Sequence, residues 1–269
     1  MISLARPVMG DEELAAVERV LRSGRLVLGP EAERFEAELA VRCGVPHAVT
    51  VSSGTAALHL ALLALEVGRG DEVVVPALTF PAPAAAALAV GATVVVADVD
   101  GESWNISPAA VSEAMTERTK AVIAVDQFGV PADWDALEEV TAPAGVSLVE
   151  DAACSIGARL RGRPCGSFGR VATLSFHPRK VVTTGEGGAL LTDDEELADL
   201  ARCLRDHGRS KGRFVRTGLN LRLGEVQAAI GRCQLERLDD LVGRRRRLAA
   251  QYVAALSVGG DAEDLGLRT

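Results

Sequence analysis

Aromatic residues and paired cysteines are scarce in this chain of 269 residues. Phenylalanine, tryptophan and tyrosine together make up 3% of a sequence rich in alanine and leucine, a composition typical of soluble globular proteins. The formal net charge of −8 argues against a general nucleic-acid-binding surface. The cysteines are odd in number and form no CxxC pair, so we expect neither a disulfide framework nor a metal site: Cys43, Cys154, Cys165, Cys203 and Cys233.

An uninterrupted apolar span is also lacking. Residues 73–97 carry no charge and are long enough to suggest a membrane crossing. However, three prolines and a glycine interrupt this run, and much of it is alanine, a weak membrane former. We therefore expect strands at 73–75 and 93–97 around a helix at 82–90, and no membrane contact. Residues 1–7 lack the apolar core of a signal peptide, so we expect a cytosolic setting.

Short apolar segments alternate with helical segments along the rest of the chain. Further strands are predicted at residues 48–51, 121–125, 148–150, 171–176 and 189–192. Helices are predicted at 11–23, with Asp11 as the cap, at 55–67, at 108–115, at 133–141, and as one long stretch from 222 to about 256. Because the strands are apolar throughout, the pattern predicts an α/β fold with a doubly wound, mostly parallel sheet covered on both faces.

The segment after the strand at 171–176 carries the most chemical information. Its residues SFHPRK end at Lys180, and the glycine-rich TTGEGG follows at 183–188. A lysine in this position suits an amine that forms a Schiff base, because the strand fixes the backbone and the glycines let the chain fold back beneath a planar ring. Upstream, the strand at 148–150 runs into Asp151, a carboxylate that could hold a cationic ring nitrogen or simply cap a helix.

The strand-to-helix turn at 52–55 offers a site for an anion. Its backbone N–H groups at Gly54 and Thr55, the helix dipole and the Thr55 hydroxyl all favour a phosphate. Serine and threonine at such a turn also serve as ordinary helix caps. The turn by itself does not decide between these two interpretations.

Together these segments resemble the pyridoxal-phosphate site of fold-type-I aminotransferases. More narrowly they resemble the DegT/DnrJ family of sugar aminotransferases, for which EDAA (150–153), SFHPRK and TTGEGG are characteristic. The resemblance implies a large domain with a seven-stranded-type sheet over residues 1–221, including an N-terminal helical segment. Residues 222–269 are then expected to form a long helix that leads into a small C-terminal domain, which is missing or truncated here.

The resemblance also implies which residues bind the cofactor's phosphate. Gly54 and Thr55 belong to a segment that matches the family's SGTAAL phosphate loop. Ser175 is the implied second phosphate ligand. Asn220, in GLNLR, matches an asparagine that the family supplies to the phosphate of the neighbouring subunit, which implies a homodimer.

At the cofactor ring, the resemblance makes Lys180 the attachment point and the group that moves a proton at the substrate carbon. Asp151 pairs with the ring nitrogen and keeps it protonated. Phe80 matches an aromatic residue stacked on the ring, although a core position would also suit it. Two residues depart from the family pattern: Cys154 stands where glutamine or histidine contacts the ring substituents, and Asp126 stands where histidine is common. Cys154 could equally be a small packed residue.

The implied function is a pyridoxal 5′-phosphate-dependent aminotransferase. It would move an amino group from glutamate or glutamine to a keto group of a nucleotide-linked sugar or a cyclitol. A family dehydratase is a second possibility, but that branch replaces the attachment lysine with histidine, and Lys180 argues against it. A third is a truncated cofactor-binding paralogue with little catalysis that acts as a partner or regulatory subunit.

Overall fold

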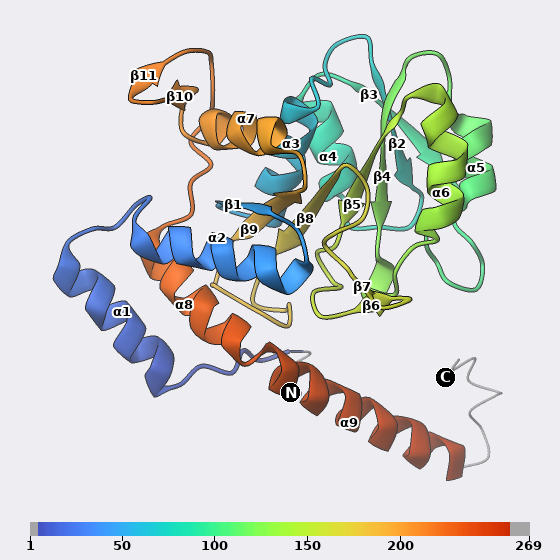
Figure 1. The fold of residues 1–269 in the computed structure, drawn as a ribbon. Coiled ribbons are helices and arrows are strands. Elements are labelled where there is room, and N and C mark those ends of the chain that lie inside the picture. Colours follow the sequence, from blue (N-terminus) through green and yellow to red (C-terminus); the bar gives the residue numbers. More distant parts are fainter. Residues whose placement is uncertain (1–4, 259–269) are drawn as a thin grey trace.

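The computed structural model describes residues 5–258 and places seven strands in one sheet (Figure 1). The strand order is β1-β9-β8-β5-β4-β2-β3. The strands are β1 (His47–Val51), β2 (Glu72–Pro76), β3 (Thr93–Ala97), β4 (Thr119–Val125), β5 (Ser147–Asp151), β8 (Val171–Ser175) and β9 (Gly188–Thr192). Two short pairs lie outside this sheet: β6 (Arg159–Leu160) with β7 (Arg163–Pro164), and β10 (Arg209–Ser210) with β11 (Arg213–Phe214).

The sheet is mostly parallel. Strands β3, β2, β4, β5 and β8 pair in parallel, and β9 runs antiparallel to both β8 and β1. Strands β2 and β9 are buried at every position, as expected for a sheet covered on both faces. Parallel neighbours need crossover connections, and helices between the strands supply them.

Helices cover both faces of the sheet, which confirms the prediction of a doubly wound α/β fold (Figure 1). Helices α3, α4 and α7 pack on one face. On the other face, α2 and α8 cover the half around β1, β9 and β8, and α5 and α6 cover the half around β2 to β5. The helices are α1 (Asp11–Ser23), α2 (Pro30–Cys43), α3 (Gly54–Ala64), α4 (Ala82–Ala89), α5 (Pro108–Ala114), α6 (Trp134–Thr141), α7 (Glu195–Arg205), α8 (Glu225–Glu236) and α9 (Leu238–Val258).

The apolar run at residues 73–97 forms β2, α4 and β3, as predicted. Its prolines lie at the end of β2 and at the start of α4. Proline is tolerated in the first turn of a helix because the N–H that it lacks would have no partner within the helix. Within residues 5–258 no helix combines the length and the apolarity needed to cross a membrane.

Several helix boundaries differ from the predictions, and the helix predicted at 55–67 already ends at Ala64. Gly10, not Asp11, is the N-cap of α1, and the side chain of Glu13 accepts a hydrogen bond from the Gly10 N–H at 2.8 Å. Asp11 lies in the first turn, where its negative charge interacts favourably with the positive end of the helix dipole. The long stretch predicted from residue 222 is two helices, because α8 ends at Glu236 and α9 begins at Leu238.

Strand alternation decides which side chains share a face at the end of β5. Val149 packs with the α3 side of the sheet and Leu148 with the α5 and α6 side. Since side chains alternate along a strand, Asp151 lies on the α3 face and Glu150 on the opposite face. The two neighbouring carboxylates of the EDAA motif therefore belong to different sites.

Candidate active site

The segment that carries the lysine turns sharply at the carboxyl end of β8. The Phe176 N–H donates to the Gly187 carbonyl at 2.8 Å, and the Thr184 N–H donates to the Phe176 carbonyl at 3.0 Å. Gly185 has a φ of +83°, in the left-handed region that favours glycine. The tight return predicted for the glycine-rich segment is thus confirmed, and it holds Lys180 at the edge of the sheet.

The Lys180 side chain is half-buried and lies against Cys154. Its backbone N–H donates to the His177 carbonyl at 2.8 Å, and its Nζ donates to the Cys154 Sγ at 3.1 Å. Cys154 is exposed, so the interpretation of this cysteine as a packed core residue is wrong. The cysteine instead contacts the amine of the predicted attachment lysine.

Asp151 is buried beside this lysine. Its carboxylate accepts a hydrogen bond from the Ala153 N–H at 3.1 Å. Burial raises the pKa of Asp151 to about 6, and the Asp126 charge adds to this, while the Ala153 bond and the Lys180 charge act in the opposite direction. The residues after β5 form a turn rather than a helix, so the helix-cap interpretation is wrong. A buried carboxylate with one hydrogen bond is suited to receive a cationic ring nitrogen.

The turn before α3 combines a helix cap with an anion site. The Ser53 Oγ accepts the Ala56 N–H at 3.0 Å, and the Ser53 carbonyl accepts the next N–H of the helix, so the capping interpretation holds for this serine. The N–H groups of Gly54 and Thr55 have no hydrogen-bond partner among residues 5–258. A Cβ on Gly54 would lie 2.8 Å from the Ser175 Cβ, so the turn closes directly on the end of β8. These free N–H groups and two hydroxyls fit a phosphate.

The loop after β2 presents an aromatic ring and an unpaired hydroxyl. Phe80 is 68% exposed, so its interpretation as a core residue is wrong. The neighbouring Thr79 hydroxyl is buried and has no hydrogen-bond partner in the described part of the chain. Sequence reasoning missed Thr79, although its place at the carboxyl end of a parallel strand was a usable signal. A buried hydroxyl without a hydrogen-bond partner destabilises the folded state, and a polar ligand bound at this edge would provide the missing partner.

Asn220 lies exposed on the segment before α8, with its amide oriented by Arg222. The Arg222 Nε donates to the Asn220 Oδ1 at 2.9 Å, and the Arg222 Nη1 donates to the Asp206 Oδ1 at 2.9 Å. The Asn220 Oδ1 is thus engaged, while its NH₂ group donates to no partner among the described residues. The Ser52 N–H donates to the Leu221 carbonyl at 2.8 Å, which keeps this segment beside the turn before α3. Sequence reasoning gave Arg222 no role.

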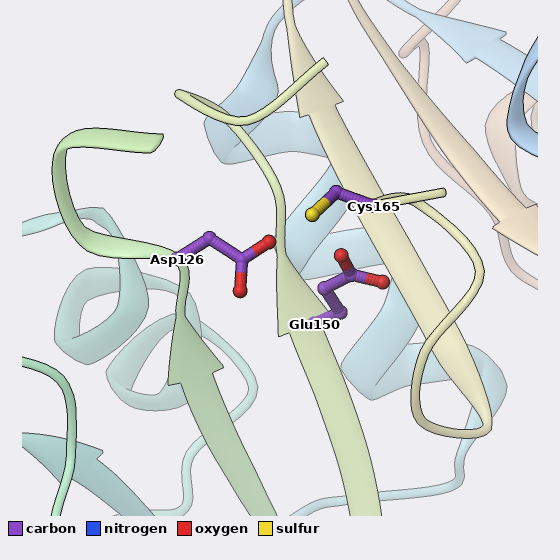
Figure 2. Close-up of side chains that lie close together, drawn as sticks. All are labelled: Asp126, Glu150 and Cys165. Carbon is purple, nitrogen blue, oxygen red and sulfur yellow. The ribbon is translucent and has the colours of Figure 1, made fainter. Parts of the chain in front are cut away.

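A second group of polar side chains lies on the opposite face of β5. Figure 2 shows Asp126, Glu150 and Cys165 pointing toward one another from the end of β4, from β5 and from the loop after β7. All three are buried. Each carboxylate oxygen accepts a hydrogen bond: those of Asp126 from Ala132 N–H (3.0 Å), Trp134 Nε1 (3.3 Å) and Ser155 Oγ (2.7 Å), and those of Glu150 from Gly166 N–H (2.7 Å) and Phe168 N–H (2.7 Å).

This group is arranged to hold a proton. Its ligand atoms lie within 4.8 Å of one another, as in a metal site. Burial, and then the neighbouring Asp126 carboxylate, raise the pKa of Glu150 well above 4.5, which favours its protonated form. Burial and both carboxylates also raise the pKa of the Cys165 thiol, whereas a metal would need the thiolate. The hydrogen bonds already stabilise both carboxylates within the protein.

A hollow on the surface lies elsewhere. It has a volume of about 710 Å³, is formed by α1, α2 and α8, and none of the site residues lines it. The structure brings Lys180, Cys154 and Asp151 together and joins Gly54 to Ser175. Thr55, Phe80 and Asn220 are exposed around them, so the site within one chain is an open edge of the sheet.

The fold and this site define a class: α/β proteins with a lysine and a buried aspartate at the carboxyl edge of a mostly parallel sheet. The model of the DegT/DnrJ/EryC1/StrS aminotransferase family matches residues 7–263. The chain belongs to this family. It is 47% identical over 245 residues to a dTDP-3-amino-3,4,6-trideoxy-alpha-D-glucose transaminase of Streptomyces venezuelae. That match covers 90% of this chain and 65% of the relative, so the chain spans just under two thirds of its length.

Solved structures agree with this assignment. S. venezuelae DesV, in complex with a ketimine intermediate, superposes with a TM-score of 0.86 at 46% identity, over 91% of this chain and 67% of DesV. The aminotransferase TlmJ of Streptoalloteichus hindustanus gives a TM-score of 0.92 at 40% identity, over 96% of this chain and 72% of TlmJ. The PLP form of Spr1654 from Streptococcus pneumoniae gives 0.91 at 31% identity, over 95% and 71%. The predicted family and fold class are therefore confirmed.

Proposed function

We propose that this chain binds pyridoxal 5′-phosphate and works as an aminotransferase. In this proposal it moves an amino group from glutamate or glutamine to a keto group of a nucleotide-linked sugar or a cyclitol. The observation that carries the proposal is the position of the Lys180 Nζ beside the buried Asp151, on the face of the sheet where Gly54 contacts Ser175. When bound, the cofactor holds the amino group between half-reactions and delocalises the electrons released at the substrate carbon.

The cofactor's phosphate binds at the turn before α3. The N–H groups of Gly54 and Thr55 and the hydroxyls of Thr55 and Ser175 donate to its oxygens, and the helix dipole favours the negative charge. The contact between Gly54 and Ser175 supports this assignment, because it sets donors from two elements around one point. The unpaired Thr79 hydroxyl and the exposed Phe80 ring lie in the loop that would cover the cofactor ring.

Asp151 and Lys180 divide the proton chemistry between them. The buried Asp151 carboxylate keeps the proton on the ring nitrogen, since the cation it pairs with offsets the cost of its burial. Lys180 anchors the cofactor through its Nζ. When its Nζ is not attached to the cofactor, Lys180 would take the proton from the substrate α-carbon and would return one during the second half of the reaction.

A nucleotide-linked keto sugar is the acceptor that the relatives favour. The S. venezuelae relative is named as the transaminase of a dTDP-linked aminosugar. Identity of 47% to it supports the same acceptor class here. Glutamate and glutamine both remain in the proposal as donors, and a cyclitol is the alternative acceptor.

The proposal includes a two-fold homodimer in which Asn220 reaches the neighbouring subunit's phosphate. The NH₂ group of Asn220 supports this role, because Arg222 engages the amide oxygen and the NH₂ donors have no partner among residues 5–258. The division into residues 1–221 and 222–269 is also proposed, and it is supported by the exposure of residues 244–256 in α9. A cytosolic setting is supported by the five free cysteines.

The function is tested by spectroscopy and covalent trapping. The chain is saturated with pyridoxal phosphate, and glutamate or glutamine is added while the absorbance of the cofactor is followed. We expect a donor-dependent spectral change that a dTDP-linked keto sugar reverses. Borohydride should then fix the cofactor on the peptide that contains Lys180, because reduction makes the attachment permanent. Labelling of another lysine would refute the site, and binding without spectral change would favour the non-catalytic paralogue.

A further inference from the structure

The contact between Cys154 and Lys180 brings a thiol and an amine within reacting distance. The Sγ and Nζ atoms are 3.1 Å apart. Backbone bonds hold both residues: the turn that carries Cys154 is tied at its start by the Ala152 N–H donating to the Thr173 carbonyl at 2.9 Å, and Lys180 is tied to His177. Two side chains fixed by separate elements remain in contact without a large loss of conformational entropy.

The site is specific to this cysteine. Cys154 is exposed, so a small oxidant reaches its sulfur. Cys43, Cys165 and Cys203 are buried, and burial raises the pKa of the Cys43 thiol to about 12. Cys233 is half-buried, and its Sγ lies 3.8 Å from a backbone carbonyl rather than an amine. Within residues 5–258, Cys154 is the only one of the five cysteines whose thiol forms a hydrogen bond with a lysine.

We propose that Cys154 and Lys180 form a covalent modification site, at which hydrogen peroxide joins their side chains through a sulfur–nitrogen bond when the lysine amine is free. First, the Cys154 sulfur attacks peroxide: the O–O bond breaks, sulfur is oxidised to the sulfenic acid, and one water leaves. The unprotonated Nζ of Lys180 then attacks the sulfur, the S–O bond breaks, and a second water leaves. Overall, one thiol, one amine and one peroxide give one sulfenamide and two waters.

The sulfur–nitrogen bond would reversibly inhibit cofactor attachment at Lys180. A sulfenamide nitrogen cannot anchor the cofactor, a consequence that rests on the proposed function. An external dithiol reverses the bond: one thiolate attacks the sulfur, the amine leaves with a proton, and the second thiolate restores the Cys154 thiol as the external disulfide forms. The residue that departs from the family pattern thereby gains a chemical role that glutamine or histidine cannot fill.

The test uses the full chain in cofactor-free and cofactor-saturated forms. Each is treated with hydrogen peroxide, free thiols are alkylated, and digested peptides are analysed by mass spectrometry with and without prior dithiothreitol. In the cofactor-free chain we expect the Cys154 and Lys180 peptides joined, with a mass two hydrogens below their sum, and separated again by dithiothreitol. Cys154→Ser should abolish the product. Lys180→Arg should abolish it while Cys154 is still oxidised, and the control Cys233→Ser should retain it.

The outcomes separate this inference from the proposed function. Oxidation of Cys154 to sulfenic or sulfinic acid in the cofactor-free wild type, with Lys180 unmodified, would overturn the inference. If the joined peptide forms but saturation with pyridoxal phosphate does not suppress it, the modification site stands and the lysine is not the cofactor's anchor. Thermal unfolding of each variant shows whether it is folded. If a variant does not fold, the peptides of the unsubstituted chain still show whether the sulfur–nitrogen bond forms.

Discussion

At the scale of single residues, the candidate site is built from groups whose charge depends on their neighbours. Asp151 is buried beside Lys180, and Glu150 on the opposite face is buried beside Asp126. Two adjacent carboxyl groups thus have different surroundings, set by the face to which each one points. Burial raises the pKa of both, but the Lys180 charge acts against this rise at Asp151, whereas the Asp126 charge adds to it at Glu150.

Asp151→Asn should separate cofactor binding from amino transfer. The substitution keeps the shape but removes the charge that holds the proton on the ring nitrogen. We expect a several-fold weaker affinity for pyridoxal phosphate and a loss of kcat on the order of 100-fold or more, since the lost interaction acts where charge develops. Asp135→Asn, at an exposed position, is the matched control. Transamination by Asp151→Asn at the wild-type rate would leave the aspartate with a structural role only.

Asp126→Asn should flatten the dependence of stability on pH. Glu150 has a pKa well above 4.5 in the folded chain, so the folded state keeps a proton that the unfolded state releases. Its contribution to the free energy of unfolding is therefore full below about pH 4.5 and is lost as pH rises through the folded pKa. The amide of asparagine removes the repelling charge and donates to Glu150, which lowers that pKa. Urea unfolding of the cofactor-free chain across this pH range measures the slope, and an unchanged slope would contradict the proton-holding pair.

At the scale of elements, the candidate site at the carboxyl edge of the sheet depends on the contact between α3 and β8. Gly54 has no side chain, which lets the start of α3 approach Ser175. The N–H groups of Gly54 and Thr55 have no hydrogen-bond partner among residues 5–258. We therefore expect this contact to turn a helix start into an anion site.

Gly54→Ala should disturb this contact. The added Cβ would lie 2.8 Å from the Ser175 Cβ, so one of the two elements must shift. We expect a loss of about 1–3 kcal/mol in the free energy of unfolding. We also expect a fall in affinity for pyridoxal phosphate that is larger than the fall for pyridoxal. Gly68→Ala, where an added Cβ meets nothing within 4 Å, is the control. Equal losses for the two cofactors would show that Gly54 acts on stability alone.

The strands were the part of the fold most open to prediction. The strand predicted at 93–97 matches β3, and the other strand predictions lie within one or two residues of the observed ends. Buried parallel strands are nearly all apolar, so composition alone marks them. By contrast, α2 and α7 were missed, since charged side chains surround their narrow buried faces. The break between α8 and α9 at Arg237 was also missed, because no glycine or proline marks it.

For the candidate site, the sequence predicted places in the fold better than contacts. Asp151 ends β5, Ser175 ends β8, Gly54 begins α3 and Lys180 lies in the loop after β8, whereas their roles stay predictions. The contact between Cys154 and Lys180 joins residues 26 positions apart, and no local pattern encodes it. Likewise Asp126 meets Glu150 only because β4 lies next to β5 in the sheet.

At the scale of the whole molecule, the candidate site within residues 5–258 is an open edge of the sheet. Thr55, Phe80 and Asn220 are exposed, while water must be kept from a reacting cofactor. The NH₂ group of Asn220 has no partner among the described residues, and its backbone segment lies beside the turn before α3 of its own chain. The asparagine could therefore serve its own chain or a neighbouring one.

Mixed dimers decide between these two arrangements. Lys180→Ala and Asn220→Ala chains, each impaired alone, are denatured together and refolded. If Asn220 serves the neighbouring subunit, every mixed dimer has one doubly damaged site and one intact site. Random pairing makes about half of the dimers mixed, so roughly a quarter of the wild-type activity should return. If Asn220 serves its own chain, both sites of the mixed dimer stay damaged, and no activity returns although subunit exchange is demonstrated. A monomer at working concentration would remove the shared site altogether, because the phosphate would then have only the donors of a single chain.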